Sequence, residues 1–153
     1  MHKRKLVFLS LALAGPSFSA CFGGDGTGSD ESFVRALCEA QTELSAGVDE
    51  AVTAAGGQTD PQKTIDLLIP PLEAYVDAFR DADPPEDLKE WHDASADQIE
   101  AAVERFKDER TLASLEGFED SPVPDPPTAA KARLRAAAAD VEQCAGVAFL
   151  RPD

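Results

Sequence analysis

Histidine, tryptophan, tyrosine and methionine are scarce in this chain of 153 residues, which holds two histidines and one residue of each of the other three types. Only His92 lies beyond residue 20, and Lys89 stands three positions before it. The chain therefore lacks the paired histidines of zinc hydrolases and the Glu-x-x-His pairs of di-iron bundles. No Gly-x-Ser-x-Gly motif accompanies His92 either. These absences predict a protein with no enzymatic activity, no cofactor and no metal site.

Basic residues are also few, with 14 Lys and Arg against 29 Asp and Glu and a net charge of −15. Residues 1–20 contain Lys3, Arg4 and Lys5 and no acid, so their removal leaves 11 basic residues and a net charge of −18. A surface of this sign repels nucleic acid and anionic headgroups. Nucleic acid is therefore excluded as a partner.

No apolar run approaches the roughly 20 residues that span a bilayer. The longest, residues 6–14, follows a basic start and is followed by Gly15-Pro16 and a short stretch of small residues. This order of basic, apolar and small regions is typical of an export signal that is later cleaved. We expect residues 1–20 to be that signal.

The sequence Phe18-Ser19-Ala20-Cys21 resembles the lipobox of bacterial lipoproteins, although the family usually has Leu where Phe18 stands. The resemblance implies that lipid is attached to Cys21 and that the chain is cut before it. The alternative is ordinary signal-peptidase cleavage after Ser19, with small residues at Ser17 and Ser19. We expect lipidation, and with it an extracytoplasmic domain anchored to a bacterial membrane.

The segment that follows Cys21 is rich in glycine, with four glycines in residues 23–30. Such a composition is typical of a flexible coil. We expect residues 21–31 to form a tether and residues 32–153 to form one folded domain.

Three cysteines are an odd number, which requires an explanation in an exported protein. If Cys21 carries lipid, Cys38 and Cys144 remain to form a disulfide in an oxidising compartment. The alternative is two buried free thiols.

Apolar residues recur at steps of three and four through most of the expected domain, which predicts helices. We expect helices over residues 32–55, 61–79, 86–106 (with a short extension to 118) and 128–149. Pro70-Pro71 lies inside the second and predicts a kink or a split there. The fold predicted is all-α, an up-down four-helix bundle in which the antiparallel first and last helices bring Cys38 to Cys144.

Tyr75, Trp91 and His92 are the candidate ligand-binding residues, beside the expected kink at Pro70. The alternative places Trp91 on the core-facing side of the third helix and His92 at its edge, bonded to a neighbouring acid. Asp97, Glu100 and Glu104 also share one helix face. That spacing suits a weak divalent-cation site or a solvated face of mixed charge, and nearby basic residues favour the latter.

The chain also resembles small, uncharacterised two-cysteine helical lipoproteins of bacteria. The resemblance depends on residues 33–38 (FVRALC), 88–92 (LKEWH) and 141–144 (VEQC) and on an Asp-Pro-Pro turn. It implies an extracytoplasmic helical domain and brings no activity, substrate or site residue. The function expected is a membrane-tethered, non-enzymatic module that binds an envelope protein. The alternative is a carrier of a small ligand or divalent cation.

Overall fold

The computed structural model describes residues 27–56, 60–115, 123–139, 141, 144 and 146–150. Four α-helices make up most of these residues: α1 (Asp30–Ala55), α2 (Pro61–Asp81), α3 (Lys89–Glu109) and α5 (Thr128–Ala138). Three short 3₁₀ helices accompany them: η1 (Glu86–Leu88), η2 (Leu112–Leu115) and η4 (Ala148–Leu150). The described part of the chain contains no β-strand, which confirms the all-α prediction. The expected signal and Cys21 lie outside the described residues.

Local sequence explains where the first two helices begin. At α1, the Ser29 side chain accepts from the Ser32 amide and the Ser32 side chain accepts from the Ser29 amide, both at 3.1 Å. This reciprocal capping box satisfies two amides that the helix itself leaves without partners. At α2, the Asp60 side chain accepts from the Gln62 amide at 3.0 Å, and Pro61 occupies the first helical position.

The double proline does not split the second helix. Helix α2 continues through Pro70 and Pro71 to Asp81. Helix α1 packs closely against α2 at these prolines. A Cβ atom at Gly47 would lie only 2.7 Å from the Cβ atom of Pro71. Glycine at position 47 therefore lets the two helices approach each other at the prolines.

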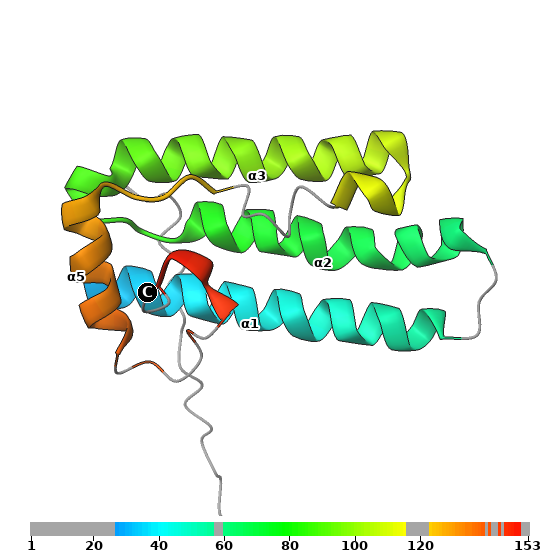
Figure 1. The fold of residues 1–153 in the computed structure, drawn as a ribbon, viewed down its shortest axis with the longest axis horizontal. Helices are drawn as coiled ribbons and strands as arrows, with labels where there is room; N and C mark the ends of the chain where they lie inside the picture. Colours follow the sequence, from blue (N-terminus) through cyan, green and yellow to red (C-terminus); the bar gives the residue numbers. More distant parts are fainter. Residues whose placement is uncertain are drawn as a thin grey trace, which may run out of the picture.

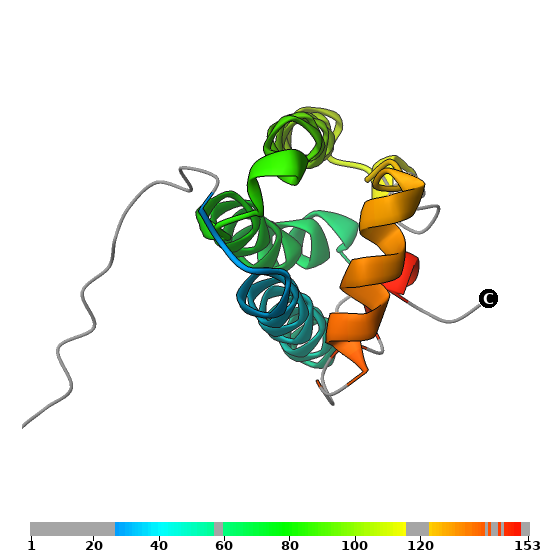
Figure 2. The ribbon, with the colours of Figure 1, turned by 90° about the vertical axis from the view of Figure 1, so that its left-hand side faces the viewer.

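Helices α1, α2 and α3 lie side by side and alternate in direction, with α2 in the middle (Figure 1). Helix α5 instead runs crosswise at one end of this array and packs against α1 (Figures 1 and 2). The fourth helix therefore departs from the predicted up-down bundle, in which it would run antiparallel to the first.

The last helix is also shorter than predicted, since α5 ends at Ala138 rather than near residue 149. Beyond it, the amides of Val141, Cys144, Val147 and Leu150 each donate to the carbonyl three residues earlier, at 3.0 to 3.2 Å. Bonds of this 3₁₀ type align side chains at every third position. Cys144, Val147 and Leu150 are buried in this way.

One core joins all the elements. The four α-helices, η1 and the loop before η1 all contribute large, fully buried apolar side chains. These are Phe33, Phe106, Ile65, Leu88, Ile99, Leu134, Val34, Val103 and Pro84. Among the described helices, none has the length and apolar composition needed to cross a membrane.

Candidate functional site

The predicted ligand-binding residues lie in an aromatic cluster formed by Phe33, Phe79, Trp91, His92 and Phe149. The His92 ring is stacked on Phe79, with centroids 5.1 Å apart, and meets the edge of Phe33 at 5.5 Å. Trp91 makes edge contacts with Phe33 at 6.5 Å and Phe149 at 5.5 Å. These rings pack against one another, and Phe33 and Phe79 cover His92.

His92 is buried, with 3% of its surface exposed, so the prediction of a position at the helix edge is wrong. Its Nε2 lies 2.7 Å from the main-chain oxygen of Phe79, so this nitrogen carries the proton and donates it. Phe79 belongs to the last turn of α2, where carbonyl groups lack partners within the helix. Its oxygen also accepts from the Ala82 amide at 3.3 Å. The imidazole therefore caps the end of α2. This hydrogen bond offsets the cost of burying the polar ring of His92.

Trp91 is half-buried. It therefore lies at the edge of the core, the position that the sequence predicts for His92. Its indole Nε1 donates to the main-chain oxygen of Pro124 at 2.8 Å. This bond ties the first turn of α3 to the segment that leads into α5. The order of burial is therefore the reverse of the predicted one, with His92 in the core and Trp91 at its rim.

Tyr75 also contacts Phe79, with ring centroids 6.2 Å apart and the rings tilted by 56°. Burial raises the pKa of Tyr75 to about 12, because the phenolate would lose its hydration. The structure thus brings the three candidate residues into one neighbourhood, in which Phe79 contacts both Tyr75 and His92.

The two later cysteines lie at disulfide distance, with 4.7 Å between their Cα atoms and a sequence separation of 106. Cys38 is in the third turn of α1 and Cys144 follows the end of α5. Both side chains are buried in the core. The pair therefore joins the start of the domain to its last segment, although Cys144 does not lie on the last helix as predicted.

The end of the expected tether packs on the domain from residue 27 onward. Thr27 forms an isolated antiparallel bridge with Pro85, and the Gly28 amide donates to the Pro84 carbonyl at 3.2 Å. A Cβ atom at position 28 would overlap the main-chain oxygen of Asp83, so only glycine fits. The prediction of a flexible tether over residues 21–31 is therefore wrong for residues 27–31, because Thr27, Gly28 and Ser29 dock and Asp30 starts α1.

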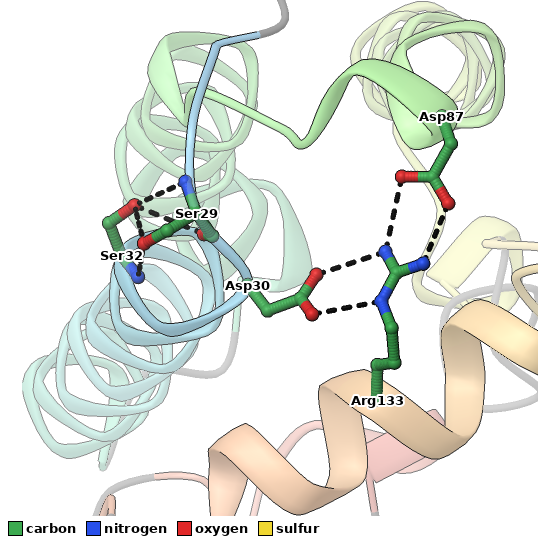
Figure 3. Close-up of polar contacts among 5 residues, drawn as sticks. All are labelled: Ser29, Asp30, Ser32, Asp87 and Arg133. Atoms are coloured by element: carbon green, nitrogen blue, oxygen red, sulfur yellow. Dashed lines mark hydrogen bonds and ion pairs between the residues drawn. The ribbon is translucent and has the colours of Figure 1, made fainter.

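Arg133 of α5 fixes this docked segment to two other elements (Figure 3). Its Nε and Nη2 donate to Asp30 at 2.9 and 3.1 Å, and its Nη1 and Nη2 donate to Asp87 at 2.8 and 3.1 Å. The hydrogen bonds to Asp87 and Asp30 raise the pKa of Arg133, and the bond from Arg133 lowers the pKa of Asp87. One guanidinium thus clamps α1, η1 and α5 with the planar geometry that suits two carboxylates.

Sequence reasoning did not identify this clamp. Asp30 and Arg133 are 103 residues apart, and Asp87 and Arg133 are 46 apart. The one available signal was the acidic first turn of α1 and of η1, which favours a nearby cation only in general terms.

The acidic residues proposed as a weak cation site pair with basic side chains. Arg80 of α2 donates to Asp97 at 2.9 Å and also to Glu100. Lys107 lies 2.8 Å from both Glu104 and Glu73. Within the described ranges, no three histidine, cysteine, aspartate or glutamate side chains form a group able to hold a metal ion. The ion pairs of Arg80 and Lys107 instead form a solvated face of mixed charge that also links α2 to α3.

No protein-family model, curated protein or solved structure matches this chain. The site must therefore be interpreted from its own geometry.

Proposed function

We propose that the protein is a bacterial lipoprotein, cut before Cys21, anchored to a membrane by lipid on Cys21 and acting outside the cytoplasm as a non-enzymatic binding module for an envelope protein. The observation that carries this proposal is the short apolar run of residues 6–14 that leads, through small residues, to Ser19-Ala20-Cys21.

The cysteine pair supports the proposed compartment. Cys38 and Cys144 lie at disulfide distance, and disulfides persist in exported proteins but are rare in the reducing cytosol. The pairing also leaves Cys21 as the odd cysteine, available for lipid.

The surroundings of His92 support a binding module over an enzyme. Its Nε2 is committed to the Phe79 carbonyl and its ring is covered by Phe33 and Phe79. A general base must reach its substrate, and this imidazole is buried. The same filled cluster gives little support to the alternative of a carrier with a pocket at Tyr75, Trp91 and His92.

Expression of the full-length chain in a bacterial host tests the anchor. The protein is expected in the membrane fraction, with an intact mass that corresponds to a diacylated or triacylated chain starting at Cys21. Cys21→Ser is expected to be soluble or to keep its signal. An unlipidated mature chain starting at Ala20 would contradict the proposal.

The binding role is tested by mild crosslinking of intact cells that carry the anchored protein, followed by purification and mass spectrometry. A single envelope protein enriched with the anchored chain, and lost when the helical domain is replaced by an unrelated one on the same anchor, is the expected result. Enrichment that depends on the anchor alone would contradict it.

A further inference from the structure

We infer that the bundle stands on the membrane with one particular end facing the lipid headgroups: the end that carries Thr27, Gly28, the first turn of α1, η1 and α5, called here the docked end. This inference rests on the proposed lipid anchor at Cys21. The opposite end, formed by the C-terminus of α1, the N-terminus of α2 and the C-terminus of α3, is called the far end and points away from the membrane.

The length of the free tether is the first argument. Thr27 is already paired with Pro85, and Gly28 with Pro84. Only residues 22–26 separate Cys21 from the docked segment. At about 3.3 to 3.6 Å per residue, this connection reaches roughly 20 Å at full extension. The docked end therefore cannot move further than that from the lipid.

The size of the bundle is the second argument. Helix α1 has 26 residues and starts at the docked end, so at 1.5 Å per residue it extends about 39 Å away from the attachment point. That length is about twice the reach of the tether. The tether is thus too short for the bundle to turn over and present its far end to the same membrane.

The distribution of charge is the third argument. It disfavours an orientation in which the bundle lies flat with α1 against the membrane. Residues 36–55 of α1 contain Glu39, Glu43, Asp49 and Glu50, all exposed, and no lysine or arginine. Anionic headgroups repel such a face. At the docked end, Asp30 and Asp87 are paired with Arg133, and Glu31 is paired with Arg35.

Contacts at the docked end hold residues 27–30 firmly on the bundle, so that a restraint on Thr27 also restrains the whole bundle. The connection does not pivot at residue 27, because the capping box of Ser29 and Ser32 and the Arg133 clamp hold the start of α1 in place (Figure 3). Residues from Thr27 onward therefore move together with the bundle.

The test uses the single tryptophan as a fluorescence donor. Trp91 lies in the first turn of α3, near the docked end, whereas Leu112 is 49% exposed in η2 near the far end. The 21 residues of α3 separate the two positions by about 30 Å. The lipidated protein is reconstituted into vesicles of phosphatidylcholine and phosphatidylglycerol that contain a dansyl-labelled lipid headgroup as acceptor.

Energy transfer from Trp91 is expected to be several-fold larger than transfer from the double variant Trp91→Phe/Leu112→Trp. Both proteins must show the same melting curve and the same flotation with vesicles, which ensures that only the position of the donor differs. A third protein with about 20 Gly and Ser residues inserted between Gly24 and Asp25 is expected to lose most of the difference, because a flexible chain of that length no longer restrains the bundle.

The outcomes separate the two proposals. A protein that floats with the vesicles and carries lipid by intact mass, but transfers energy equally from residues 91 and 112, overturns the orientation and leaves the anchor intact. A protein without lipid overturns the proposed anchor, and the orientation falls with it.

Discussion

The Nε2 atom of His92, on α3, donates to the main-chain oxygen of Phe79 at 2.7 Å, in the last turn of α2. A buried polar side chain thus completes the end of a neighbouring helix. This contact joins the middle helix of the array to α3 at the docked end, and its loss is expected to be costly.

Replacement of His92 by alanine is expected to lower the free energy of unfolding by about 2–4 kcal/mol, through loss of ring packing and of the hydrogen bond. His92→Phe keeps a ring between Phe33 and Phe79 and is expected to cost about 1 kcal/mol. Denaturant unfolding measures both. The exposed Gln98→Ala on the same helix serves as control and should stay within about 0.5 kcal/mol. A cost of His92→Ala no larger than that of the control would contradict a capping role.

Removal of the Cys38–Cys144 bridge is expected to destabilise the domain while leaving it helical. The two residues are separated by 106 positions, for which loop closure predicts a loss on the order of 4–5 kcal/mol. The exported wild type in reductant should approach the stability of Cys38→Ala/Cys144→Ala, and reductant should not affect the double variant. Alkylation of both thiols in unreduced, exported protein would show that the bridge is absent.

Tyr75 is the only tyrosine, so its ionisation can be followed directly by absorbance. Its folded pKa, about 12, is raised above the ordinary value of 10.0. A raised pKa means that the contribution of the buried phenol to stability is fully present below about pH 10 and is lost as pH rises from about 10 to about 12. The loss expected is on the order of 2–3 kcal/mol.

The measurement is the absorbance change of tyrosine against pH, in water and in denaturant. Tyr75→Phe is the matched variant, because it keeps the ring beside Phe79 and removes the ionisable group. Its stability should decline less between pH 10 and 12. A folded midpoint equal to that in denaturant would show that the phenol is accessible to water.

Gly28→Ala is expected to displace the docked segment, because the new Cβ atom would overlap the main-chain oxygen of Asp83. The expected cost is about 1–3 kcal/mol. Gly56→Ala is the control, because it lies at the opposite end of α1 and its φ of −57° suits alanine. Its Cβ atom would contact the Thr53 main-chain oxygen tightly, at 3.0 Å, but would not touch the docked segment.

Hydrogen exchange measures the effect locally. The amide of residue 28 donates to Pro84, so its exchange should be fast in Gly28→Ala and slow in the wild type and in Gly56→Ala. Equal protection of this amide in all three proteins would be incompatible with docking at Gly28.

Arg133 lowers the pKa of Asp87 through its hydrogen bond to that carboxylate. A lowered pKa stabilises the folded state above the ordinary pKa of aspartate, about 3.9, and this stabilisation is lost as pH falls through the folded value. Arg133→Gln is expected to move the Asp87 pKa, measured by NMR, up toward the ordinary value. Arg35→Gln, which affects the separate pair with Glu31, should leave it unchanged. The shift should shrink at high salt, because the pair is exposed.

Helix content and the cysteine pairing were accessible from the sequence because both depend on local or compositional rules. Apolar residues repeated at steps of three and four predict a helix wherever it packs. Asp60 and Pro61 mark the start of the second helix by rules that act within one turn. The Ser29 cap, by contrast, lies in the stretch predicted as a tether. An odd number of cysteines left Cys38 and Cys144 as the natural pair once Cys21 was set aside.

Residues 141–150 show where apolar spacing does not predict the type of helix correctly. The sequence predicts an α-helix as far as residue 149, and Val141, Cys144, Val147 and Leu150 recur there and just beyond at every third position. Their carbonyl and amide partners are three residues apart, so the segment is of the 3₁₀ type. On an α-helix with 3.6 residues per turn, positions 141 and 150 would lie on opposite faces. The 3₁₀ bonds instead place Cys144, Val147 and Leu150 on one side, where all three are buried.

Tertiary structure alone decided which of two neighbouring aromatic side chains entered the core. The pattern on α3 suited Trp91 for burial, but the end of α2 presents the Phe79 carbonyl and the Phe33 and Phe79 rings to His92 instead. It likewise brought Arg133 to Asp30 and Asp87 across distant parts of the chain. Helical periodicity determines which residues share a face of one helix. The partner of that face is set by how whole helices pack, because buried polar groups must find acceptors that other elements supply.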